Sequence, residues 1–201
     1  MLTAQELIVI FVISFITNAT PFFGAPYTLI TTSILIKSGV SPLSLILAVV
    51  LSGLGASLSK LVMYALGIAI RKPLKDNKNI LLIEKISKSY GFYAALFILT
   101  ILPFLPLDDY IFLAGGVARL SVFRMILISI IGKTLKSGIE ISIELTGISL
   151  IASIFSINEF ELSIISIIVF ILLGILLFKL DWEEILRRGE KFLREKLKIN
   201  L

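Results

Sequence analysis

Two apolar stretches of this chain are each broken by a pair of prolines. The first break reads TPFFGAP over residues 20–26, and the second reads TILPFLP over residues 100–106. One full bilayer crossing needs about 20 residues, so two crossings need about 40 and a turn. The two broken stretches, 5–36 and 91–117, are shorter than that. Each therefore predicts a re-entrant hairpin, whose two half-helices enter and leave the membrane on the same side.

The alternative for the first stretch is a single helix kinked at Pro21 and Pro26. A glycine, Gly24, lies between these prolines, and this combination favours a turn over a kink. We expect polar and turn-forming residues to shape the hairpin tips and gate a path between them. They are Asn18, Thr20, Pro21, Gly24, Pro26, Pro103, Pro106, Asp108 and Asp109.

The composition indicates one polytopic membrane domain over residues 1–201. The mean hydropathy is +1.03, and 16% of residues are charged, against about 25% in soluble domains. Cysteine and histidine are absent, which excludes disulfides, thiolate nucleophiles, imidazole bases and Cys/His metal sites. We therefore expect neither an enzyme nor a cofactor. The net charge of +5 predicts basic segments facing lipid rather than nucleic acid.

The remaining segments follow from capping and charge. Ser41 before a proline predicts a transmembrane helix over 42–70, and Ser121 similarly predicts one over 121–155. The other segments are an amphipathic linker at 71–90, a final transmembrane helix at 161–180 and a basic amphipathic tail at 181–201.

The two halves of the chain share the same order of segments: a broken run, a serine cap and a long crossing. An offset of 80 residues pairs Thr20 with Thr100 and Ser41 with Ser121. Because one crossing separates the halves, the second is inverted relative to the first. The predicted fold is an all-α polytopic membrane protein with two inverted repeats. Each repeat is a re-entrant helical hairpin followed by a long transmembrane helix, and a final transmembrane helix follows.

The distribution of basic residues predicts the orientation. If each hairpin returns to its own side, the linker 71–90, Arg119, Arg124 and the tail share one face. The Lys/Arg excess marks that face as cytoplasmic. We expect a multi-pass plasma-membrane protein with a cytoplasmic C-terminus and, by parity, an outer N-terminus. The residues expected on the other face are Lys37, Glu159 and Glu161.

Three lysines, Lys60, Lys133 and Lys136, lie inside the predicted crossings. A charge at the bilayer centre costs about 2.5–3.5 kcal/mol on insertion scales, so such groups should pair or face a cavity. Neighbours in sequence cannot neutralise all three, and we interpret them as lining a path for an anion. With Arg119 and Arg124 they form the predicted substrate-binding set.

The acidic residues near these lysines have two interpretations each. Lys136 and Glu140 are spaced as a helix pair, so Glu140 is predicted to pair charge. Glu144 follows on the same face, and it is predicted either to lie near the far membrane interface or to pair charge as well. Asp108 and Asp109 suit either an N-cap of the returning half-helix or a counter-ion or proton-coupling carboxylate. Small residues and one tyrosine on the first crossing are predicted to pack helices closely. They are Gly53, Gly55, Tyr64 and Gly67.

The second hairpin carries the most specific motif. Pro103, the run AGGVARL at 114–120 and Phe123-Arg124 resemble the DedA family, also called VTT-domain or SNARE-associated Golgi protein homologues. The resemblance covers roughly residues 15–150. Gly55, Tyr64 and Gly67 look like the family's glycine and tyrosine crossing.

The sequence departs from the family pattern at charged positions. Thr100 and Pro106 replace two hairpin arginines, Asn18 replaces an acidic residue, and Lys60 replaces an aspartate. The turn ending in Asp108-Asp109 is closer to a subgroup with a Pro-x-Pro-acidic turn.

The resemblance implies movement of lipid across the bilayer. The leading hypothesis is a flippase or scramblase for a phospholipid or polyprenyl phosphate, with membrane lipid as partner, no nucleic acid and a possible homo-oligomer. One alternative is a secondary transporter of a small solute or ion, driven by protons or sodium through Asp108 and Asp109. The other is a non-transporting assembly or scaffold protein that acts through its basic surfaces.

Overall fold

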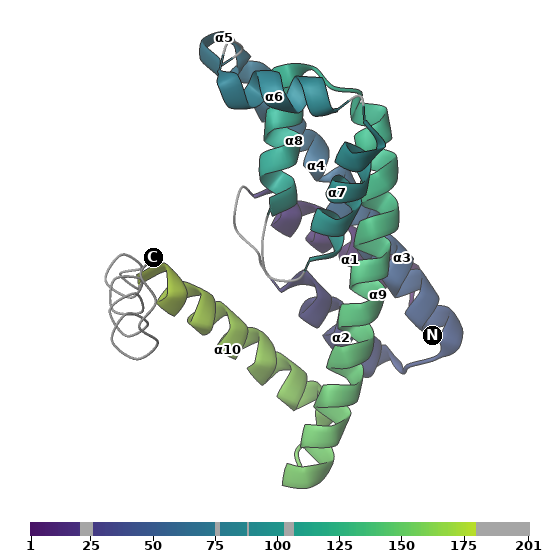
Figure 1. The fold of residues 1–201 in the computed structure, drawn as a ribbon. Helices are drawn as coiled ribbons and strands as arrows, with labels where there is room; N and C mark the ends of the chain where they lie inside the picture. The colour runs from purple at the N-terminus through teal and green to yellow at the C-terminus, as the bar shows by residue number, and fades with distance from the viewer. Residues whose placement is uncertain (21–25, 75–76, 88, 103–106, 180–201) are drawn as a thin grey trace, which may run out of the picture. The chain divides into compact units, whose positions relative to one another are not determined.

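The computed structural model describes residues 1–20, 26–74, 77–87, 89–102 and 107–179, and all regular structure in these ranges is helical (Figure 1). The helices are α1 (Ala4–Ala19), α2 (Tyr27–Ser38), α3 (Pro42–Leu58), α4 (Lys60–Ala69), α5 (Arg71–Leu74), α6 (Lys78–Ile86), α7 (Tyr90–Ile101), α8 (Leu107–Ala118), α9 (Val122–Phe155) and α10 (Glu159–Lys179). Residues Met1–Ile167 form one compact unit, and a second unit begins at Ile168 within α10.

Among the described residues, two helical stretches are long and apolar enough to cross a bilayer. Pro42–Ala69, which joins α3 and α4, has 28 residues, and Val122–Phe155 has 34. At a rise of about 1.5 Å per residue, both exceed the roughly 30 Å of a hydrocarbon core. A core helix of a soluble protein would be mostly buried, but only 17% of the most apolar window of α9 is buried. By length and composition, these two helices are candidate membrane spans.

The helix boundaries differ from the expected ones mainly at Ser59. Ser41 caps α3, with its hydroxyl accepting from the Ser44 amide at 3.2 Å. The sequence predicts one helix over 42–70, but α3 ends at Leu58 and α4 begins at Lys60. The hydroxyl of Ser59 bonds to the Ala56 carbonyl at 2.8 Å, and such bonds compete with the helix ladder and bend it.

The helices flanking the first proline break fold back on each other. The amino group of Met1 bonds to the Ser38 carbonyl at 3.3 Å, and the Ser38 hydroxyl bonds to the Glu6 carboxylate. These contacts place the start of α1 beside the end of α2. Helices α7 and α8 flank the second break and also pack against each other. Pro21, Gly24, Pro103 and Pro106 lie outside the described residues.

The helices of the two halves interlock in a repeated pattern. Helix α1 packs on α3 as α7 packs on α9, and α2 packs on α9 as α8 packs on α4. Thus α1 and α7, which precede the two proline breaks, each contact the long helical stretch of their own half. Helices α2 and α8, which follow the breaks, contact the long stretch of the other half. Two apolar clusters result. One contains Met63, Leu96, Phe112, Met125 and Ile126, and the other contains Ile10, Leu35, Ala48 and Ile141.

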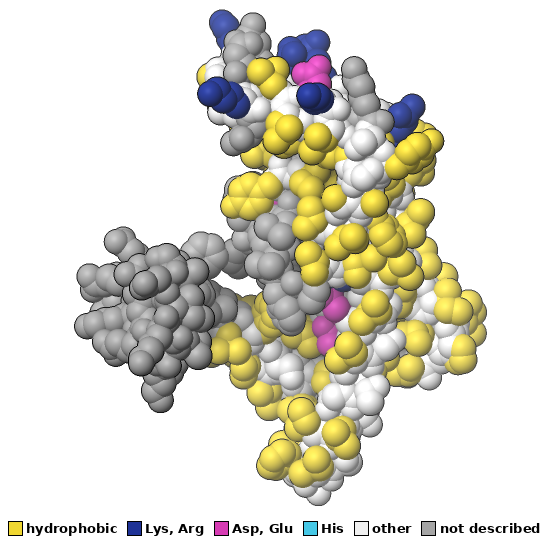
Figure 2. Space-filling model, in the orientation of Figure 1, with side chains coloured by type: hydrophobic (Ala, Val, Ile, Leu, Met, Phe, Trp, Pro, Cys, Tyr) yellow, Lys and Arg dark blue, Asp and Glu magenta, His cyan; other side chains and the backbone are white. Residues whose placement is uncertain are grey.

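The linker between α4 and α7 carries exposed charges. Lys and Arg side chains gather over α5 and α6 at the top of Figure 2, beside exposed Leu81, Leu82 and Ile86. The expected linker over 71–90 therefore contains two short helices, which pack on α8. The predicted tail at 181–201 lies outside the described residues.

Close backbone contact holds α4 against α8. A Cβ at Gly67 would lie 2.0 Å from the Leu113 carbonyl oxygen, and one at Gly116 would lie 2.1 Å from the Tyr64 carbonyl oxygen. The Tyr64 hydroxyl also bonds to the Leu120 carbonyl at 2.6 Å. Two glycines therefore let these helices touch. Gly53 and Gly55 lie at similar crossings of α3 with α9 and α1.

Gly67→Ala should destabilise the protein. The added methyl group meets a backbone carbonyl that cannot rotate away, and overpacking of this kind costs about 1–3 kcal/mol. Thermal unfolding of the purified protein in detergent measures the loss. Gly147→Ala on α9 is the matched control, because a Cβ there meets nothing within 4 Å. Equal midpoints for the two variants would contradict the proposed crossing.

Candidate functional site: a buried lysine–aspartate cluster

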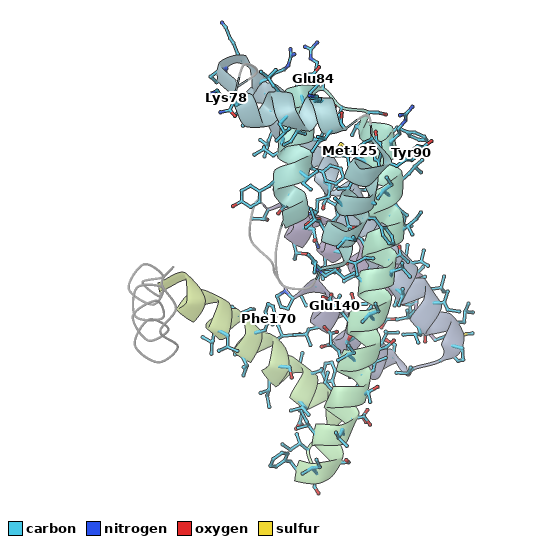
Figure 3. All side chains as sticks on the ribbon, in the orientation of Figure 1. Lys78, Glu84, Tyr90, Met125, Glu140 and Phe170 are labelled. Carbon is cyan, nitrogen blue, oxygen red and sulfur yellow. The ribbon has the colours of Figure 1, made fainter. Side chains whose placement is uncertain are left out.

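The buried face of α9 is apolar near Met125 and Ile141 and polar between them. Met125 and Ile126 join one apolar cluster, and Ile141 joins the other. Between them the buried positions are Ser129, Gly132, Lys133 and Ser137. In Figure 3, Met125 and Glu140 mark the two sides of this polar stretch on α9. The polar residues therefore lie between the two apolar clusters.

Four charged side chains meet at this polar stretch, and we call them the Lys–Asp cluster. They are Lys60, Asp108, Asp109 and Lys133, with relative exposures of 2%, 2%, 3% and 3%. The Asp108 Oδ2 atom lies 2.7 Å from Lys133 Nζ and 3.4 Å from Lys60 Nζ, and Lys60 also pairs with Asp109. One carboxylate oxygen thus lies between two ammonium groups.

The Lys–Asp cluster draws on both halves of the chain. Lys60 is the first residue of α4, directly after Ser59, and Lys133 lies in the middle of α9. Asp108 and Asp109 occupy the first turn of α8, where negative charge interacts favourably with the helix dipole. Two cations and two anions balance, so the cluster has no formal net charge. Asp108 and Asp109 are therefore counter-ions of the lysines as well as first-turn carboxylates.

Lysines of the long helices also contact the ends of the interrupted helices. Lys60 Nζ donates to the carbonyl of Asn18 at 3.4 Å, near the end of α1. Lys136 Nζ donates to the carbonyl of Leu102 at 3.2 Å, at the end of α7. The last carbonyls of a helix lack partners within it and carry partial negative charge. Each lysine therefore satisfies a carbonyl exposed by a proline break. Lys136 pairs with Glu140 as expected, at 3.8 Å.

Glu144 does not pair with a cation among the described residues, which corrects the predicted charge pairing. Its carboxylate accepts from Thr28 at 2.7 Å and from Thr32 at 2.6 Å. These threonines are one helical turn apart on α2, so both face α9. Thr28 and Thr32 are not among the predicted site residues, although Tyr27-Thr28 and Thr31-Thr32 form a polar stripe on an otherwise apolar half-helix.

The other predicted site residues lie apart from the cluster. Arg119 and Arg124 are exposed and do not join Lys60 and Lys133, which corrects the predicted substrate-binding set. Arg119 ends α8 with a φ of 55°. Both exposed arginines lie at the helix junction between α8 and α9, so neither enters the polar stretch of α9. Asn18 and Thr20 bond to carbonyls one turn back in α1, and Pro26 precedes α2.

Comparison with protein-family models, with curated proteins and with solved structures gives no match. The resemblance to the DedA family therefore rests on the motif of the second hairpin and on the glycine and tyrosine crossing. Within the described ranges, no group of three or more acidic side chains gathers to hold a metal ion.

Asp108→Asn should destabilise the protein more than Asp108→Asn combined with Lys133→Met. The single change leaves a buried ammonium without its carboxylate, and breaking one partner of a buried pair costs about 3–5 kcal/mol. The double change removes one cation and one anion together and leaves Lys60 with Asp109. Thermal unfolding of the single and double variants measures this coupling.

Glu84→Gln is the control for that comparison. Glu84 is exposed on α6, at the top of Figure 3, so its neutralisation should leave the unfolding midpoint unchanged. Strictly additive losses from Asp108→Asn and Lys133→Met would show that the two side chains do not interact in the folded protein.

Proposed function

We propose that this protein moves a phosphate-bearing lipid across the bilayer, as a flippase or scramblase, and that the Lys–Asp cluster is its anion site. One observation carries the proposal: a single oxygen of Asp108 lies between the ammonium groups of Lys60 and Lys133. A phosphate oxygen has the charge and size to take that position. The substrate would then exchange with a carboxylate the protein already supplies.

The depth of the two lysines supports a site near mid-membrane. Lys60 precedes Ala69, the end of its stretch, by nine residues, and Lys133 follows Val122 by eleven. At about 1.5 Å per residue these offsets are about 14 and about 17 Å, close to half of a roughly 30 Å hydrocarbon core. Charges at that depth are costly and are usually functional.

The arrangement around the cluster suits a headgroup whose acyl chains stay in lipid. The cluster lies among α4, α8 and α9, while the outer side of α9 exposes Ile131, Leu135, Ile139 and Ile143. Helix α8 follows the second proline break and carries both carboxylates, so its movement would separate them from Lys133. A path for the phosphate would open where the carboxylate leaves.

The interlocked packing and the family resemblance point the same way. The matched contacts of α1 with α3 and of α7 with α9 suit two inverted repeats, each with a re-entrant hairpin. The DedA-like motif implies lipid movement, although Lys60 replaces a family aspartate. In the orientation we propose, α5 and α6 face the cytoplasm, because their Lys/Arg excess follows the positive-inside rule.

Reconstituted protein should accelerate transbilayer movement of a labelled phospholipid or polyprenyl phosphate over empty liposomes. Lys133→Met should slow that movement at least about tenfold, as expected when a charged hydrogen bond to phosphate is lost. Lys85→Gln, on the exposed side of α6, is the control and should keep the wild-type rate. A dequenching or reductant-accessibility assay follows the label.

The double variant Asp108→Asn with Lys133→Met separates transport from folding. The double variant keeps the charge balance of the cluster, so it should fold. It lacks Lys133, so it should move lipid as slowly as the single variant Lys133→Met. Wild-type protein that leaves both lipid classes at the rate of empty liposomes would rule out the proposal.

Glu144 favours a second candidate, an ion-coupled transporter. Its carboxylate lies against α2 with hydroxyl partners and no cation among the described residues, so a proton or sodium ion could balance it. Asp108 and Asp109, which the sequence suggested as proton-coupling or sodium-coupling carboxylates, already form ion pairs with Lys60.

Glu144→Gln should abolish any dependence of transport on a proton or sodium gradient, because the amide cannot change charge. Flux into proteoliposomes under imposed pH or sodium gradients measures this dependence. Glu161→Gln, an exposed carboxylate on α10, should leave it intact. If the flux through the wild-type protein is the same with and without the pH and sodium gradients, the ion-coupled transporter is ruled out.

A further inference from the structure

A pocket of about 570 Å³ lies at the end of α2 and the start of α10, away from the Lys–Asp cluster. Its lining residues all belong to the first compact unit, Met1–Ile167. They are Ile36, Lys37, Asn158, Glu159 and Phe160. The pocket is open toward the surroundings of the protein, so it could hold one end of a larger molecule.

The lining offers three different binding groups. Lys37 provides an ammonium group and Glu159 a carboxylate. Phe160 provides an aromatic ring, and Lys37 Nζ lies 5.9 Å from the centroid of that ring. The face of the ring therefore already attracts a cation. A ligand with one positive and one negative group would match this pocket better than a simple anion.

The rim of the pocket is held in place by a helix cap. The Asn158 side-chain oxygen accepts from the amide of Phe160 at 2.9 Å and from that of Glu161 at 3.4 Å. These bonds fix the first turn of α10 and so the backbone that carries Glu159 and Phe160. The N-terminus of α10 also adds partial positive charge beside the pocket.

The pocket lies where charged residues meet apolar helices. Glu159 and Glu161 precede the apolar run of α10, and Lys37 ends the apolar α2. Phe155, the last residue of the candidate span α9, is three residues before Asn158. Charged and aromatic residues at the end of an apolar span mark the level of lipid headgroups.

We propose that this pocket binds the headgroup of a zwitterionic phospholipid from the adjoining leaflet. Lys37 would leave the ring and pair with the phosphate, while the ammonium of the lipid would take its place over Phe160 and pair with Glu159. Lipids with a purely anionic headgroup lack the second contact and meet the Glu159 carboxylate. The inference requires the membrane location but not lipid transport through the Lys–Asp cluster.

Native mass spectrometry of the detergent-purified protein, incubated with equal phosphatidylethanolamine and phosphatidylglycerol, tests the site. The wild type should retain the zwitterionic lipid preferentially. Glu159→Gln should lower the ratio of bound zwitterionic to anionic lipid by up to about fivefold, the upper end of the effect expected of one exposed charge pair. Lys37→Gln should lower retention of both lipids. Lys78→Gln and Glu84→Gln on α6 are the matched controls and should keep the wild-type ratio.

Equal lipid ratios in the wild type and Glu159→Gln, or no lipid retained by the wild type, would overturn the proposal. Free phosphoethanolamine forms the second arm of the experiment. If it displaces the lipid at equal concentration, the pocket takes a soluble zwitterion rather than a membrane lipid. The two proposals can fail separately. If lipid translocation depends on Lys133 but Glu159→Gln keeps the wild-type ratio of bound lipids, the headgroup pocket is refuted and the proposed transport is not.

Discussion

The shared contact of Asp108 with Lys60 and Lys133 determines how the helices fit together. Three helices supply these charges, and none of the charges has an adequate partner on its own helix. Buried ions are costly unless they are paired, so this contact favours a rotation and register of α4, α8 and α9 that brings the charges together. The two apolar clusters on either side add burial, but isoleucine and leucine contacts alone would permit several registers.

Two lysines, Lys60 and Lys136, help to explain how the chain tolerates interrupted helices in an apolar environment. An interrupted helix exposes carbonyls at one end and amides at the other, and both need partners where water is absent. Lys60 and Lys136 bond to carbonyls at the ends of α1 and α7, and Asp108 and Asp109 lie at the start of α8. Charged side chains therefore stabilise the free ends of the interrupted helices, and the lysines among them come from neighbouring helices.

Local features were predictable from the sequence, and long-range partners were not. Ser41 and Pro42 marked the start of α3 because capping depends on adjacent residues. The lysines were recognisable as costly in an apolar helix, and a counter-ion role was one of two interpretations left open for Asp108. Their pairing spans 48 residues to Lys60 and 25 to Lys133 (108 − 60 and 133 − 108), and it depends on helix rotations that no local pattern encodes. The same holds for Glu144 with Thr28.

The glycine crossing of α4 and α8 has a mechanical consequence. Because Gly67 and Gly116 bring the two backbones into contact, these helices should move as one rigid body. Lys60 and Asp109 both belong to that body, so their ion pair would persist during any rearrangement. The seam that opens would then run along α9, and the contact broken first would be that of Lys133 with Asp108. One lysine would travel with the moving part while the other stayed behind.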